Sequence, residues 1–155
     1  KGKPVLSAGD GLNLFQFLSS YDAGEGFAEV VGRTECLGQI YNIVHPQPRT
    51  WNQWHQAVAE AIRVEAEIVS VAQETLIAIA PERFKGLASN FGHTQVFDGQ
   101  KLAQVIPEFQ PKTPLVESLA ENVEWMDQRN LIPNSDENRL EDKIIAAVRK
   151  LPTQI

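Results

Sequence analysis

A glycine-rich turn near the start of the chain sets the first limit on the fold. Gly9-Asp10-Gly11 follows a short apolar run that begins at Val5. A phosphate-binding loop would lead directly into a helix, because the free N–H groups of a helix N-terminus hold the phosphate. Here residues 12–17 read as a second extended stretch, and Asp-Gly is a dipeptide typical of tight turns. We therefore predict a β-hairpin at this point and no nucleotide-binding loop.

The remaining chain reads as short strands alternating with helices. Ser19 and Thr50 are good N-cap residues, and prolines such as Pro81 and Pro107 end helices. Gly24 and Gly26 lie inside one helix, where close packing or a distorted helix would explain them, since each costs about 1 kcal/mol relative to alanine. The predicted strands are 38–45, 67–71 and 94–97. The predicted helices are 19–31, 50–62, 73–80, 100–106, one that begins at Thr113-Pro114, and 136–150. Residues 83–93 show no clear period and are predicted to form a loop.

Three residue pairs at or inside these helices are expected to have structural roles. Ser19 with Asp22, and Thr50 with Gln53, have the spacing of a capping box, with Asp22 in place of the usual glutamate. Trp51 and Trp54 lie on the apolar stripe of the helix that follows Thr50, so we expect them to pack in the core.

The composition of the chain argues against several classes of binding partner. The chain has 155 residues, enough for a single domain, with 14 basic and 20 acidic residues and a net charge of −6. Nucleic-acid binding needs a basic surface that releases counterions from phosphates, so we expect no nucleic-acid partner. Cys36 is the only cysteine, which rules out an intrachain disulfide and fits a reducing compartment. The sequence has neither an apolar run of roughly 20 residues nor a signal-peptide pattern, and we expect a cytoplasmic location without membrane contact.

The sequence does not contain a self-sufficient catalytic or metal site. His45, His55 and His93 are far apart and have no partners at metal-ligand spacing. A Gly-x-Ser-x-Gly nucleophile motif is absent, and Cys36 has no neighbouring base. We therefore expect no catalytic residue and no metal in this chain.

Three ordered stretches nevertheless resemble a known family. "GDGLNLFQFLSSYDAGEGFAEVV" is similar to a turn, strand and helix in which Asp22 matches the acid of a His-Val-x-Asp motif. "GQIYNIVHPQPRTWNQWHQAVAEAI" is similar to a strand that ends in Tyr-Asn-Ile, followed by a Thr-capped helix. "VFDGQKLAQVIPEFQPKTPLVESLAENVEWM" is similar to an Asp-x-Ser/Gly-Lys helix and a final helix. Together they resemble the C-terminal portion of an extended short-chain dehydrogenase/reductase, of the NAD-dependent epimerase/dehydratase family.

This resemblance implies an α/β fold (α+β in isolation), mostly helical with short strands. Residues 1–155 would be one domain, the substrate-side lobe with the late elements of a Rossmann domain, without the N-terminal dinucleotide-binding part. The family's Gly-x-x-Gly-x-x-Gly and Tyr-x-x-x-Lys motifs are both missing, because Tyr21 is followed four places on by Glu25 and Tyr41 by His45. The resemblance thus implies a parent epimerase, dehydratase or reductase that uses NAD or NADP, and a fragment that binds neither and does not catalyse alone.

The same resemblance suggests which residues line the substrate pocket. In nucleotide-sugar members an arginine four residues after the turn glycine binds the diphosphate, and here that residue is Phe15, while Ser19 replaces the motif histidine. A phenyl ring cannot pair with a phosphate, so we expect a less charged carbonyl or hydroxyl substrate. The predicted substrate-binding residues are Phe15, Phe17, Ser19, Arg83 and Phe84. Phe15 and Phe17 fit a core role equally well, and Ser19 fits a helix cap.

Two further expectations concern partners. The fold could instead serve as a non-catalytic, regulatory module that binds RNA or protein. The net charge of −6 predicts that the chain does not shift RNA in a gel-mobility assay. Residues 38–45 would normally extend a parallel sheet, and an unpaired strand edge promotes association. We therefore expect a homodimer formed through an exposed sheet or helix surface.

Overall fold

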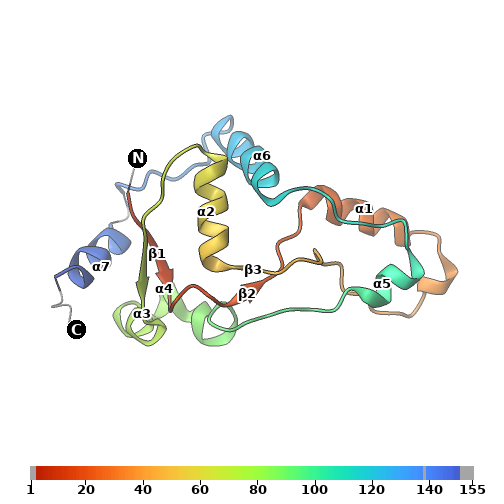
Figure 1. The fold of residues 1–155 in the computed structure, drawn as a ribbon, viewed down its shortest axis with the longest axis horizontal. Helices are drawn as coiled ribbons and strands as arrows, with labels where there is room; N and C mark the ends of the chain where they lie inside the picture. Colours follow the sequence, from red (N-terminus) through yellow and green to blue (C-terminus); the bar gives the residue numbers. More distant parts are fainter. Residues whose placement is uncertain (1–2, 138, 151–155) are drawn as a thin grey trace.

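The computed structural model describes residues 3–137 and 139–150, and it forms an elongated molecule with both ends of the described chain at one end (Figure 1). The strands are β1 (Val5–Ala8), β2 (Leu14–Phe15), β3 (Arg49–Thr50) and β4 (Ile68–Val71). The helices are α1 (Ser20–Val30), α2 (Trp51–Ala61), α3 (Gln73–Ile79), α4 (Pro81–Gly86), α5 (Gln100–Val105), α6 (Leu115–Asp127) and α7 (Leu140–Val148). A 3₁₀ turn, Thr34–Cys36, and a π-helical turn, Leu87–Phe91, complete the described elements. None of the described helices has the length and apolar character that crossing a membrane requires.

The predicted turn at Asp10-Gly11 is confirmed, but the predicted hairpin is wrong. Gly9 and Gly11 have φ angles of +65° and +70°, and the Leu12 N–H donates to Asp10 Oδ1 at 2.9 Å. The strands on either side of the turn do not pair with each other. β1 pairs in parallel with β4, and β2 pairs antiparallel with β3. The turn redirects the chain from one small sheet to another because each strand buries its apolar side chains against a different part of the molecule.

Two apolar clusters lie toward opposite ends of the molecule. The first consists of Val71, Leu76 and Ile144, with side chains from β1, α4 and α7 packed around it. The second consists of Leu102, Ile106 and Phe109, with Val30, Cys36, Tyr41 and Ile43 among its neighbours. α2 and α6 pack against each other between the two ends (Figure 1). The fold is therefore mostly helical with short strands, as expected.

Two predicted strands are not formed. Residues 38–45 have an irregular conformation, and Ile40 is 86% exposed. Side chains hold this segment instead, since Gln16 Nε2 donates to the His45 carbonyl and Asn42 Nδ2 to the Asp98 carbonyl. Residues 94–97 make a single backbone bond to β2, from Gln95 N–H to the Leu14 carbonyl. A strand needs a full ladder with a neighbour, and the described part of the chain does not provide one here. The homodimer was expected partly because an unpaired strand at 38–45 would promote association, and this strand is not formed. Homodimerisation therefore stays a prediction.

Helix boundaries also differ from the predictions. Residues 83–91 of the predicted loop 83–93 are helical, through α4 and the π-helical turn, because Pro81 takes the first helical position of α4. Gly92 and His93 lie outside these helices, as expected. The final helix begins at Leu140 and not at Asp136. The capping box at Thr50 and Gln53 is confirmed. The other predicted box is half right, since the Ser19 hydroxyl accepts from Tyr21 N–H, whereas Asp22 bonds elsewhere.

Gly24 and Gly26 of α1 provide a matched test of packing. A Cβ on Gly26 would lie 2.9 Å from Phe109 Cζ and 3.1 Å from Ile43 Cγ2, whereas a Cβ on Gly24 would meet nothing within 4 Å. We expect Gly26→Ala to lower the free energy of unfolding by about 1–3 kcal/mol through overpacking. Gly24→Ala should raise it by up to about 1 kcal/mol through helix propensity. Urea unfolding of both variants measures this, and equal effects would contradict the packing.

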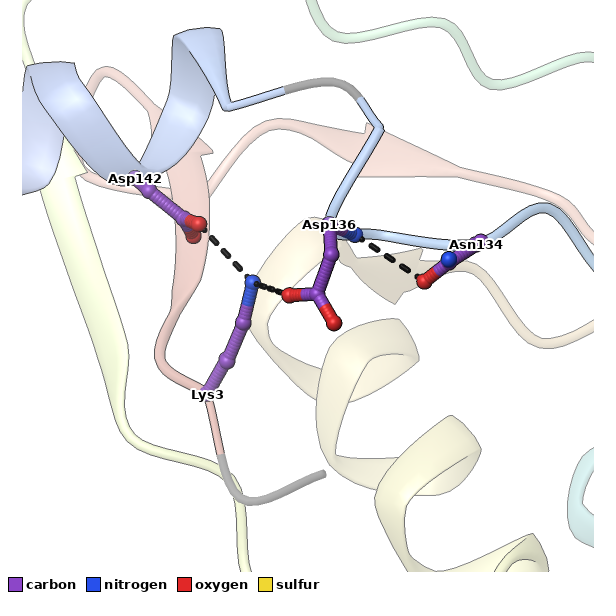
Figure 2. Close-up of polar contacts among 4 residues, drawn as sticks. All are labelled: Lys3, Asn134, Asp136 and Asp142. Atoms are coloured by element: carbon purple, nitrogen blue, oxygen red, sulfur yellow. Dashed lines mark hydrogen bonds and ion pairs between the residues drawn. The ribbon is translucent and has the colours of Figure 1, made fainter.

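A lysine joins the start of the described chain to α7 and the segment before it. Lys3 Nζ lies 2.8 Å from Asp136 Oδ1 and 2.8 Å from Asp142 Oδ2 (Figure 2). The Asp136 N–H in turn donates to Asn134 Oδ1 at 3.1 Å. The hydrogen bonds to Asp136 and then Asp142 raise the pKa of Lys3 above its ordinary value. Because β1 follows Lys3 directly, these contacts help to hold α7 beside the small parallel sheet.

This linkage gives a pH-dependent expectation. Since the pKa of Lys3 is raised on folding, its contribution to stability is fully present below the unfolded pKa of 10.5 and is lost as the pH rises through the folded pKa. Lys3→Met should therefore melt at a lower temperature than the parent chain at neutral pH. The difference should shrink above pH 10.5. Lys143→Met, an exposed substitution on α7, should leave the melting temperature nearly unchanged throughout.

Candidate functional site

A cluster of aromatic rings lies where the β2–β3 pair meets α2. Phe15 is only 8% exposed, and its ring centroid lies 4.6 Å from that of Trp51. Phe17 stacks on Trp54 at 5.8 Å and contacts Trp51 at 5.5 Å. Phe91, from the π-helical turn, lies 6.1 Å from Trp51. The structure therefore brings Phe15 and Phe17 together. Trp51 and Trp54 pack against these rings, but they are only partly buried and do not belong to either buried apolar cluster, so the core role predicted for them is only partly met.

His55 completes one side of this aromatic cluster. Its ring lies 5.4 Å from Trp54 and 6.5 Å from Trp51. Burial lowers the pKa of His55 below its ordinary value of 6.5, because an apolar environment disfavours the charged imidazolium. A lowered histidine pKa means that stability is lost as the pH falls below 6.5. His55 is thus a neutral packing residue at physiological pH.

A cavity of about 600 Å³ opens beside Phe17. Part of its lining is formed by His45, Pro46, Gln47 and Arg49, and by Gln53, Gln56 and Glu60 of α2. The segment 111–116, which includes the start of α6, forms another part. Its size is in the range of pockets that enclose small molecules. We call it the Phe17 cavity.

Hydrogen bonds fix the polar groups of the Phe17 cavity. His45 Nδ1 accepts from the Gln47 N–H at 3.1 Å, which places the proton of the neutral ring on Nε2. An Arg49 side-chain N–H donates to Gln47 Oε1 at 3.1 Å. Lys112 Nζ lies 3.9 Å from Glu25 and is 76% exposed. These groups can bind and orient a ligand.

One wall of the Phe17 cavity is held by a buried carboxylate. Asp22 of α1 is 1% exposed. Its two oxygens accept from the Thr113 N–H at 3.0 Å and from the Thr113 hydroxyl at 2.9 Å. Thr113 therefore does not cap α6, whose N-cap is Pro114. From the sequence, both Asp22 and Thr113 were assigned to helix caps. The one signal that could have indicated their contact is that Asp22 is an acidic residue on a helix face that is buried.

The other predicted site residues lie elsewhere. Ser19 is buried and caps α1. Arg83 pairs with Glu141 at 2.9 Å, and Phe84 packs against the cluster of Val71, Leu76 and Ile144. Arg83 and Phe84 therefore belong to the end of the molecule that holds α7, whereas Phe15 and Phe17 belong to the aromatic cluster. Among the described residues, no group of three potential metal ligands is close enough to hold an ion.

A second cavity, of about 650 Å³, adjoins the first. Pro46 and Pro111 line both cavities. Its other lining residues include Val44, Phe97 and Phe109, so it is the more apolar of the two. Sequence reasoning missed it because its walls come from several segments that lie far apart in the sequence.

The chain shares sequence similarity with a curated reductase. No protein-family model matches. The 2'-dehydrokanamycin reductase of Streptomyces kanamyceticus is 28% identical over 111 residues, which cover 72% of this chain and 31% of the reductase. The chain thus spans about a third of the length of this relative.

Solved structures give the class of fold. dTDP-glucose 4,6-dehydratase from Bacillus anthracis, in complex with NAD, superposes with a TM-score of 0.59 at 20% identity, over 82% of this chain and 35% of that one. UDP-glucose 4-epimerase from Thermotoga maritima, with UDP-glucose, gives 0.60 at 18% identity, over 83% and 36%. RMD from Pseudomonas aeruginosa, complexed with NADPH, gives 0.59 at 16% identity, over 81% and 36%.

These likenesses define the fold as that of part of an extended short-chain dehydrogenase/reductase. The particular neighbours are a dehydratase in complex with NAD, an epimerase with UDP-glucose, and RMD with NADPH. The dehydratase and the epimerase agree with what the sequence resemblance implied.

Proposed function

We propose that this chain is the substrate-side wall of an NAD(P)-dependent epimerase, dehydratase or reductase. The observation that carries the proposal is that the chain reproduces the fold of about a third of such enzymes but lacks the Gly-x-x-Gly-x-x-Gly and Tyr-x-x-x-Lys motifs. Cofactor binding and proton transfer would then belong to another part of the parent protein. The chain would contribute the aromatic cluster and the Phe17 cavity.

The aromatic cluster supports a substrate other than a nucleotide sugar. Phe15 is packed beneath Trp51 and offers no cationic group. Arg83 is engaged by Glu141 at the other end of the molecule. The curated relative is named as a reductase of 2'-dehydrokanamycin. This name supports a carbonyl substrate for the parent enzyme that is not attached to a nucleotide. Phe17, as the aromatic wall of the cavity, would contact that substrate.

Cofactor titration tests this proposal. The 155-residue chain and the product of its extended upstream coding sequence are each mixed with NADH or NADPH, and binding is followed by cofactor fluorescence. We expect the extended product to bind a cofactor and to oxidise it with a ketone substrate, and the 155-residue chain to do neither. Turnover by the 155-residue chain, or an extended product with no cofactor binding, would overturn the proposal.

A further inference from the structure

We infer that the Phe17 cavity binds the oxyanion group of a small molecule, a carboxylate or a phosphate, and that Arg49 is the residue that pairs with it. Arg49 lies directly opposite Phe15 in the β2–β3 pair. It is half-buried and lines the cavity. This inference rests on the proposed function for the idea that the cavity faces a substrate, but the binding itself is a property of this chain alone.

The hydrogen bonding of Arg49 leaves most of its donors available. A guanidinium has five N–H donors, and within the described residues Arg49 uses a donor only for Gln47 Oε1. No described carboxylate lies within ion-pair distance of it, in contrast to Arg33, Arg83 and Arg149. A partly buried guanidinium without a carboxylate partner favours an anionic ligand, because its planar fork matches two oxygens of a carboxylate or phosphate.

The remaining polar lining of the cavity includes one further cation and one N–H donor of a histidine ring. Lys112 adds a second positive charge and is only weakly engaged, at 3.9 Å from Glu25. His45 carries its proton on Nε2, because Nδ1 accepts from Gln47. Glu60 is the single carboxylate in the lining. The lining itself thus carries two cations and one carboxylate, and the nearby carboxylate of Asp22 is already hydrogen-bonded to Thr113.

The apolar side of the cavity suggests how large the ligand is. Phe17 and Ala57 line it together with Leu115 and Val116 of α6. A bare ion would leave these side chains in contact with water only. A ring or short carbon chain that carries one oxyanion would cover them and place its charge at Arg49.

Calorimetric titration of the 155-residue chain at low ionic strength tests the inference. The probes are inorganic phosphate and gluconate, with glucose as the uncharged comparison. We expect both anions to bind and glucose to bind at least about tenfold more weakly, since a hydrogen-bonded charge pair contributes on the order of 1.5–3 kcal/mol. Stronger binding of phosphate than of gluconate would identify a phosphate ligand, and the reverse order a carboxylate ligand.

Variants assign the binding to Arg49. Arg49→Gln should weaken the binding of the preferred anion by about tenfold or more, and Arg49→Lys should weaken it less, because lysine keeps the charge but loses the fork. Lys143→Gln removes an equal charge from the exposed surface of α7 and should leave binding unchanged. Circular dichroism melting confirms that each variant is folded. No anion binding by the parent chain, or equal binding by Arg49→Gln, would overturn the inference, and neither result bears on the cofactor titration above.

Discussion

Replacing Asp22 with alanine is expected to lower the free energy of unfolding by about 2–4 kcal/mol. Asp22 is 1% exposed, and both of its oxygens accept hydrogen bonds from Thr113. Alanine removes both acceptors and leaves the Thr113 backbone N–H without its partner, which costs more than the bonds themselves contribute. The contact joins α1 to the segment before α6, so its loss also frees one wall of the Phe17 cavity. Urea unfolding with tryptophan fluorescence measures the change.

Two milder substitutions separate the components of the Asp22 contact. Thr113→Val removes the hydroxyl but keeps the backbone N–H, so we expect a loss of about 1–2 kcal/mol. Asp22→Asn keeps the shape but has one acceptor oxygen in place of two, because its NH2 group only donates. Its effect should lie between those of Thr113→Val and Asp22→Ala. If Asp22→Ala unfolds within about 0.5 kcal/mol of the parent chain, as an ordinary surface substitution does, then the contact does not stabilise the fold.

Replacing Gly11 with alanine should have an effect of similar size, about 3 kcal/mol or more, for a different reason. A Cβ at this position would lie only 2.0 Å from Asn52 Oδ1. Asn52 cannot move away freely, because its Nδ2 donates to the Asp10 carbonyl and its backbone N–H donates to the Gly11 carbonyl. The turn and the first residues of α2 are therefore fastened together, and a side chain at Gly11 would force them apart.

Gly32→Ala is the control for Gly11→Ala. Both glycines have positive φ angles, +70° for Gly11 and +81° for Gly32, but a Cβ on Gly32 would meet nothing within 4 Å. Gly32→Ala therefore reports only the cost of a left-handed backbone, about 1–2 kcal/mol. Thermal melting of both variants should show Gly11→Ala to be clearly the less stable. Equal melting temperatures would mean that Asn52 accommodates the added methyl group.

Signals that act over a few residues predicted the local structure well. The helix stop at Pro81, the capping box at Thr50 and the turn at Asp10-Gly11 are all present. Each depends on backbone groups close in sequence, so no knowledge of the rest of the molecule is needed. Strand pairing was predicted poorly because it depends on distant partners. The apolar residues of 38–45 pattern like a strand, yet no described strand lies beside them, and side chains of Gln16 and Asn42 hold the segment instead.

The candidate site shows the same division. Phe15 and Phe17 are close in sequence, and the structure brings them together with Trp51. Arg83 is likewise next to an aromatic residue in the sequence, Phe84, but its place beside Glu141 depends on how α7 packs. The contact between Asp22 and Thr113 joins residues 91 positions apart, and sequence periodicity contains no information on such a pair. The role of Arg49 depends in the same way on the pairing of β2 with β3.

The parallel pairing of β1 with β4 has a consequence for how the chain is made. Val5 lies opposite Ile68, so the first strand leaves the ribosome long before its partner exists. Synthesis of the intervening stretch of about 60 residues, at roughly 5–20 residues per second, takes roughly 3–12 s. During that interval Val5 and Leu6 are exposed to solvent and to chaperones, and the order of translation delays the completion of this end of the fold.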